Sequence, residues 1–304
     1  MRNRYVAIIV ILAVFVGLQT FVGWNGLQYW NAVVPEGPDA LYWTVYGLLA
    51  LSYLAAMLAR KLMPYRLFKL LKVIGAYGMA VFFYGVIVLP VTDLLVWALI
   101  MGGIDAKKAV LGAGTPAVVF IAALIAVGAR NAWSPVIRRY DLTIDKSAGG
   151  RQTLHAVVAS DLHLGTIVGK KHLARLIERV DELKPDVVLL PGDVLDDSIE
   201  PYVRERMEDV MKRLHAPLGV YAVLGNHEYI GGHVTEYVER MKSIGIEVLL
   251  DRTIELEGAI VVAGRKDHAV ERFASEGRLP VEQLLAEVDP AKPVIMLDNQ
   301  PHKL

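Results

Sequence analysis

Three short polar clusters interrupt the C-terminal half of the chain at nearly constant spacing. Each cluster follows a short apolar run, and the marker residues Asp161, Asp193 and Asn226 lie 32 and 33 residues apart. The clusters are Asp161-Leu162-His163, Gly192-Asp193-Val194-Leu195-Asp196 and Gly225-Asn226-His227-Glu228, and the runs before them are residues 154–159, 187–190 and 220–224. The runs are rich in β-branched residues and short enough to be buried strands. The spacing therefore predicts strands that alternate with other elements.

Apolar residues between these runs recur at the helical period, which predicts helices between the strands. The helical positions are Leu173, Leu176, Ile177, Val180 and Leu183, and then Val203, Met207, Val210, Met211 and Leu214. A strand, a loop, a helix and a strand within about 30 residues form a βαβ unit, so we expect parallel strands. Ligands bind where the carboxyl ends of such strands open into loops, and all three clusters fall there. A fourth run, residues 293–297, ends in residues 298–302 and is a candidate contributor to the same rim.

The clusters carry oxygen and imidazole donors, which suit divalent transition ions. Asp161 and His163 are two residues apart, so in an extended chain both side chains leave on the same side and can hold one ion. Asp193 follows Gly192, where the missing side chain lets the backbone approach closely, and its carboxylate can bridge two ions. Paired ions about 3.5–4 Å apart clamp the attacking and leaving oxygens of a phosphoryl displacement. The pattern therefore favours metal-dependent phosphoester chemistry.

Each cluster also has a purely structural interpretation. Asp161 could cap its loop, and Asp193 could be a turn residue in Pro-Gly-Asp. Asn226 and His227 could form a turn at a strand end, and Glu228 is interpreted as an acid of the first helical turn, without a chemical role. The coincidence of all three clusters at strand ends favours the ligand interpretation.

The three clusters together resemble the signature of the calcineurin-like metallophosphoesterase superfamily: Asp-x-His, then Gly-Asp-x-x-Asp, then Gly-Asn-His-Glu/Asp. Residues 225–232 and 263–267 further resemble a membrane-attached bacterial branch of it. The order and spacing match, and three motifs together are far more specific than Asp-x-His alone. The resemblance implies an α/β domain at residues 136–304, with a two-layered β core flanked by helices.

The resemblance also implies ligands for two divalent metal ions, which would be manganese, iron or zinc. Asp161 and His163 would bind the first ion, and Asp193 would bridge it to the second. Asn226 and Asn299 would complete the second ion with neutral carboxamide oxygens, which are poor substitutes for imidazole. We therefore expect weak binding of the second ion or none.

Relatives place a histidine where this chain has Asn299, and they continue to a Gly-His-x-His motif that this sequence lacks. The expectation is that the domain is incomplete, either as a fragment of a longer enzyme or as a degraded one. An end so soon after a core strand favours the fragment.

His227 is the candidate catalytic acid, because a histidine most readily gives a proton near neutral pH. Asp196 would hydrogen-bond to His227 and set its orientation. A carboxylate partner fixes the imidazole tautomer and raises its pKa. The alternative for Asp196 is a solvated acid that precedes a helix.

Residues 1–135 are strongly apolar and predict a transmembrane region with about four spans. The candidate spans are residues 5–24, 41–59, 73–101 and 115–129. Residues 73–101 are too long for one simple span, so we expect Asp93 near the far interface and residues 94–101 as an interfacial or tilted extension. Asp93 could instead mark a polar intramembrane site. Residues 131–140, with Pro135, are the expected linker.

The predicted function is metal-dependent hydrolysis of a phosphodiester or pyrophosphate at the cell membrane. The membrane spans favour a lipid-linked phosphate over another phosphorylated small molecule as the substrate. A net charge of zero provides no basic surplus for nucleic acid, and the absence of cysteine excludes thiolate metal sites. The alternative is a membrane-bound binding or regulatory protein whose phosphoesterase fold is catalytically impaired.

Basic residues lie on alternate connections between the spans, which predicts a multi-pass protein with a cytoplasmic catalytic domain. They include Arg2, Arg4, Arg60, Lys61, Arg66, Lys69, Lys72, Arg130, Arg138 and Arg139, against Lys107 and Lys108 on the opposite side. A reporter fused after Arg139 should therefore be cytoplasmic, and one inserted near Pro38 should be outside. An external signal from the first fusion would overturn this topology.

Overall fold

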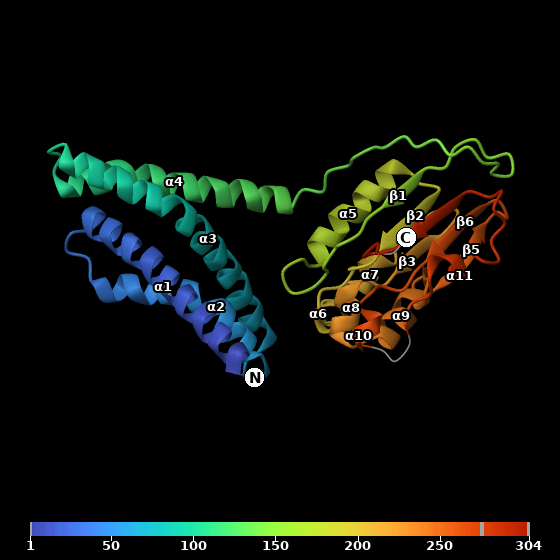
Figure 1. Cartoon of the computed structure of the whole chain (residues 1–304), viewed down its shortest axis with the longest axis horizontal. Helices are drawn as coiled ribbons and strands as arrows, with labels where there is room; N and C mark the ends of the chain where they lie inside the picture. Colours follow the sequence, from blue (N-terminus) through green and yellow to red (C-terminus); the bar gives the residue numbers. More distant parts are fainter. Residues whose placement is uncertain (1, 274–276, 303–304) are drawn as a thin grey trace. The chain divides into compact units, whose positions relative to one another are not determined.

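The computed structural model describes residues 2–273 and 277–302 (Figure 1). The chain divides between Ser134 and Pro135 into two compact units. The first unit consists of helices, and the second combines helices with two β-sheets (Figure 1). The expected fold class, an apolar helical region followed by an α/β domain, is confirmed.

Four long helices make up the first unit, and each is long and apolar enough to cross a membrane. They are α1 (Arg2–Val33), α2 (Asp39–Leu58), α3 (Tyr65–Met101) and α4 (Ala106–Ala132), with a short 3₁₀ helix η1 (Arg60–Leu62) after α2. Helix α3 runs on through Pro90 and Asp93 without interruption. Asp93 therefore lies inside a helix, where its Oδ2 accepts a hydrogen bond of 3.2 Å from Nδ2 of Asn25 in α1.

Helices α2 and α3 approach closely through two glycines. A Cβ at Gly75 would overlap the backbone of Tyr53, and a Cβ at Gly78 would overlap the carbonyl of Leu49. Small residues at helix contacts are typical of membrane proteins, where dispersion contacts between closely packed backbones drive association. The sequence of α3 thus specifies both an apolar exterior and a smooth packing face.

The second unit contains a four-stranded sheet in the order β1-β2-β3-β4, and all its strand pairs are parallel. Its strands are β1 (Ala156–Val158), β2 (Val187–Pro191), β3 (Val220–Val223) and β4 (Ile246–Val248). A three-stranded sheet follows, formed by β5 (Arg252–Leu256), β6 (Ile260–Gly264) and β7 (Val294–Leu297). Strands β5 and β6 are antiparallel, whereas β6 and β7 are parallel. The expectation of parallel strands before the polar clusters is confirmed.

The helices agree with the sequence prediction in one case and differ in the other. Helix α5 (Lys170–Leu183) spans the first predicted pattern, with Leu173, Ile177 and Val180 buried. The second pattern is divided into α6 (Glu200–Arg204) and α7 (Glu208–Met211), because Arg206 takes a left-handed φ of 53°. The remaining helices are α8 (Asn226–Gly231), α9 (Val234–Ser243), α10 (Val270–Phe273) and α11 (Val281–Leu284).

Strand β2 is buried on both faces and joins the two layers. Val188 and Leu190 belong to the core shared with α5, whereas Val187 and Leu189 pack in a second core with residues of β6 and β7. Alternation along the strand sends neighbouring side chains to opposite faces, so one strand contributes to both cores. Both sheets therefore deliver loops to the region at the carboxyl end of β2.

Candidate metal centre

The loops after β1 and β2 lie together through main-chain hydrogen bonds. The amide of Asp161 donates to the carbonyl of Gly192 at 3.2 Å, and that of His163 donates to the carbonyl of Asp193 at 3.0 Å. Asp161, His163 and Asp193 all have left-handed backbones, with φ values of 55°, 45° and 51°. The expectation that Asp161 and His163 lie in extended chain is therefore wrong. Their side chains are brought together by an irregular loop in which both residues have left-handed backbones, and not by strand alternation.

Two groups of donor atoms converge on this pair of loops. Asp161, His163 and Asp193 each offer one oxygen or nitrogen, and these atoms lie within 4.8 Å of one another. His163, Asp196 and His227 form a second group with the same spread. Three donors at this separation can surround a divalent ion after small side-chain movements, and carboxylate with imidazole is a suitable ligand mixture. The donor set of the first group thus fits a transition-metal ion.

His227 lies in the first turn of α8 and contacts three of the predicted site residues. Its backbone amide donates to Oδ1 of Asp193 at 3.0 Å, and its ring meets that of His163 edge to face, with centroids 4.5 Å apart. Its Nδ1 lies 3.9 Å from Oδ1 of Asp196 but 2.7 Å from Oδ1 of Asp197. The short contact lacks the alignment of a hydrogen bond. The carboxylate closest to His227 is thus Asp197 and not the expected Asp196.

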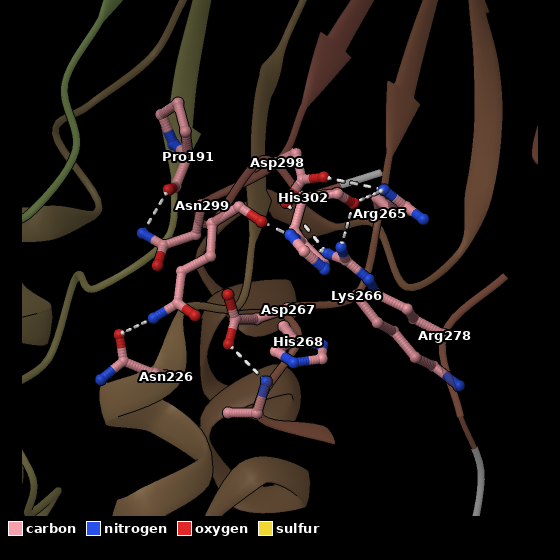
Figure 2. Close-up of polar contacts among 12 residues, drawn as sticks. Pro191, Asn226, Arg265, Lys266, Asp267, His268, Arg278, Asp298, Asn299 and His302 are labelled. Carbon is pink, nitrogen blue, oxygen red and sulfur yellow. Dashed lines mark hydrogen bonds and ion pairs between the residues drawn. The ribbon is translucent and has the colours of Figure 1, made fainter. Parts of the chain in front are cut away.

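Asn226 and Asn299 reach this rim from different sheets (Figure 2). Asn226 follows β3, and its Oδ1 accepts a hydrogen bond of 2.8 Å from Nε2 of Gln300. Asn299 follows β7, and its Nδ2 donates to the carbonyl of Pro191 at 2.9 Å. Both are held by chain contacts at the carboxyl end of β2. Residues 299 and 300 therefore lie at the same rim as the three polar clusters, as expected, and the side chains that they bring there are amides.

Two glycines allow the loops to approach so closely. A Cβ at Gly192, where φ is 83°, would lie 2.7 Å from the amide nitrogen of Gly225 and 2.9 Å from Cβ of Asn299. A Cβ at Gly225 would overlap the carboxylate of Asp193. Any larger side chain at either position would push the loops after β2 and β3 apart.

Glu228 was given no role from the sequence, yet it is buried at the centre of this region with 4% of its surface exposed. Its carboxylate accepts hydrogen bonds from the amides of Asp193, Leu195 and Gly225 at 3.1, 2.8 and 2.8 Å. Burial raises the pKa of Glu228 to about 7, although the backbone hydrogen bonds from Leu195 and Gly225 oppose that rise. Glu228 is the last residue of the Gly-Asn-His-Glu/Asp motif, but nothing in the sequence indicated that it is buried.

A second feature without a sequence signal is a charge network behind Asn299 (Figure 2). Asp298 lies between two arginines, with its carboxylate 3.2 Å from Arg265 and 3.4 Å from Arg278, and the side chains of all three are 4% exposed. Both guanidinium groups also donate to the carbonyl of His302. Charge-assisted bonds of this kind hold a planar fork in one orientation. The network fixes the segment that carries Asn299 and Gln300.

Comparison with known proteins agrees with this geometry. The family model described as calcineurin-like phosphoesterase matches residues 154–302. No solved structure matches significantly.

Three curated relatives illustrate the similarity. A transmembrane protein with metallophosphoesterase domain from Danio rerio is 31% identical over 61% of this chain and 44% of its own length. An uncharacterized metallophosphoesterase from Aquifex aeolicus is 29% identical over 54% of this chain and 62% of its own length. The UDP-2,3-diacylglucosamine pyrophosphatase LpxG of Chlamydia trachomatis is 33% identical over 31% of this chain and 28% of its own length.

The chain thus spans less than two thirds of the length of these curated relatives. The match to the family model, residues 154–302, covers the part of the chain that carries the three polar clusters. Residues 154–302 therefore form a calcineurin-like phosphoesterase domain.

Proposed function

We propose that the chain is a metal-dependent phosphoesterase that hydrolyses a phosphodiester or pyrophosphate bond. The observation that carries this proposal is the convergence of Asp161, His163 and Asp193 at the carboxyl ends of β1 and β2. Their donors belong to backbone turns that main-chain hydrogen bonds hold in place, so the ligands are organised before any ion arrives. Organisation of this kind is what a catalytic metal site requires.

In this proposal the chain offers two sets of metal ligands, and one set binds its ion more tightly than the other. Asp161, His163 and Asp193 would hold the first ion. Asp193, shared between the two sets, would hold the second ion together with Asn226 and Asn299. When bound, such ions polarise phosphoryl oxygens and provide a nucleophile from water near neutral pH. The second set has one carboxylate and two neutral amides, so the second ion binds more weakly.

His227 is proposed to give a proton to the oxygen of the leaving group. Its ring lies against that of His163, and Asp197 is the carboxylate closest to its Nδ1. An acid beside one ring nitrogen can orient the imidazole, and the other ring nitrogen is then the atom proposed to serve the substrate. This geometry supports Asp197 as the orienting acid in place of Asp196.

The proposed setting is the cytoplasmic surface of the cell membrane, with a lipid-linked phosphate as the substrate class. Four helices suited to membrane spanning precede the domain. A relative is named for hydrolysis of a diacylated nucleotide sugar pyrophosphate, which is a lipid-like phosphoanhydride. Helical spans would keep the domain near headgroups and raise the local concentration of such a substrate.

An impaired binding or regulatory protein is the second candidate. The observation that favours it is that Asn226 and Asn299 are neutral amides, which do not supply the negative charge that a divalent ion needs. Both side chains are also hydrogen-bonded within the chain, Asn226 to Gln300 and Asn299 to the carbonyl of Pro191. The two candidates differ in turnover and share the fold.

The full chain, purified in detergent, should hydrolyse a generic bis-aryl phosphodiester in the presence of manganese and lose this activity with a chelator. Asn299→His should increase the rate at limiting manganese, because an imidazole replaces a weak amide ligand. If the unmodified chain binds manganese without turnover and Asn299→His restores turnover, the impaired candidate is correct.

Replacement of His227 and of Asp193 should have different effects on the metal. His227→Ala should lower turnover roughly 10²–10⁴-fold, as expected for loss of a general acid, with metal content little changed. Asp193→Asn should lose both metal and rate, because a bridging carboxylate is gone. Metal analysis by atomic emission on both variants distinguishes these outcomes. Equal loss of metal would make His227 a ligand within the second donor group.

Lipid-linked substrates should be preferred over soluble nucleotides in one preparation. A lipid pyrophosphate in mixed micelles, compared with a nucleotide diphosphate sugar that has the same bond but no acyl chain, isolates the contribution of the lipid. Cleavage of the soluble compound alone would reject the lipid substrate and leave the phosphoesterase assignment in place.

A further inference from the structure

Glu228 connects two of the segments that carry the proposed ligands, the loop after β2 and the start of α8. Its Oε2 accepts from the amides of Asp193 and Gly225, and its Oε1 accepts from the amide of Leu195. Asp193 and Leu195 belong to the loop after β2, whereas Gly225 precedes α8, in which Glu228 itself lies. One carboxylate therefore joins three main-chain donors from two segments.

The hydrogen bonds of Glu228 act on a residue in a restrained conformation. Asp193 has a φ of 51°, a left-handed backbone that residues with a side chain rarely adopt. Glu228 binds its amide, and the amide of His163 donates to its carbonyl at 3.0 Å. The amide of His227 donates to Oδ1 of the Asp193 side chain. Asp193 is thus gripped at its nitrogen, its carbonyl and one carboxylate oxygen.

The burial of Glu228 makes these bonds costly to lose. The side chain is almost entirely removed from water, so each amide that it binds would otherwise be a buried donor in search of a partner. An acid that only capped the start of α8 would bond the amide of Gly225 and would not need to reach across to the loop after β2.

We propose that Glu228 is a positioning residue, which fixes the carboxylate of Asp193 for metal binding and couples it to the loop that carries Asn226 and His227. This inference rests on the proposed function, since it assigns Asp193 to the metal. Glu228 does not touch the ion or the substrate. It sets the backbone from which the bridging ligand extends, as outer-shell groups do for ligands in metal sites.

Glu228→Gln is the variant that tests this role, because it keeps the shape and removes one acceptor. A carboxamide has a single oxygen, so its NH₂ group must face either the amide of Leu195 or the amides of Asp193 and Gly225. Asp267→Asn is the matched control. Asp267 is likewise buried and its charge also acts on Asp193, but it bonds the amide of Ala269 at 2.8 Å instead of the loop after β2.

Two measurements on the full chain in detergent follow. Hydrogen exchange by mass spectrometry, without metal, should show faster exchange at residues 193–195 in Glu228→Gln and no change there in Asp267→Asn. Titration with manganese should show an affinity about 10–100-fold lower in Glu228→Gln, the usual loss for outer-shell changes. The affinity of Asp267→Asn should fall less than that of Glu228→Gln, because this change removes a buried charge near Asp193 without removing a bond to the loop after β2.

Glu228→Asp provides a second variant if Glu228→Gln does not fold, since it keeps the charge and withdraws the carboxylate by one methylene. Its hydrogen exchange at residues 193–195 and its manganese affinity should lie between those of the unmodified chain and those of Glu228→Gln. Unchanged exchange at residues 193–195 together with unchanged manganese affinity overturns the positioning role, as does unfolding of both variants. If the unmodified chain binds no manganese, the proposed function itself fails, whatever the exchange data show.

Discussion

The close approach of the loops after β1 and β2 is the constraint on which the rest of the domain depends. Hydrogen bonds between main-chain groups hold Asp161 and His163 against residues 192 and 193. Three non-glycine residues adopt left-handed backbones there, each at an energetic cost that the surrounding bonds must offset. Glycines at 192 and 225 then let the segments that carry Asn226 and Asn299 approach the loop after β2, so ligand geometry is set by backbone packing before side chains contribute.

Elements defined by hydrophobic period were predictable from the sequence. Strands β1, β2 and β3, their parallel order and helix α5 follow from β-branched runs and a 3.6-residue stripe. The motifs also identified which residues gather at the strand ends. The conformation at Asp161 and the break at Arg206 were not predictable, because a positive φ in a residue other than glycine depends on contacts from distant segments and leaves no local pattern.

The parts that were missed share a dependence on burial. Glu228, Asp298 and Arg265 are charged residues of types that usually lie on the surface, yet their side chains are buried. Charged side chains are rarely interior unless they are paired. Their partners are distant in the sequence. Glu228 bonds the loop after β2, which lies 33 to 35 residues before it, and Arg265 pairs with Asp298, which lies 33 residues after it. Sequence reasoning without such pairings places acids in solvent. Asp196 was expected to meet His227 because of its place in the motif, but Asp197 lies closer to Nδ1 of His227.

The order in which the rim is assembled has a consequence for the timing of folding. Asp161 enters the chain early, whereas Asn299 and Gln300 follow β7, which pairs with β6 and lies next to β2 at the rim. Contacts of such wide sequence separation form late, after the loop-closure entropy has been overcome. During synthesis the apolar helices emerge first, so a membrane-inserted chain would carry an open rim until β7 adds. Uptake of the second proposed ion, which Asn299 would help to hold, would then follow the pairing of β7 and would be slow in any variant that delays this pairing.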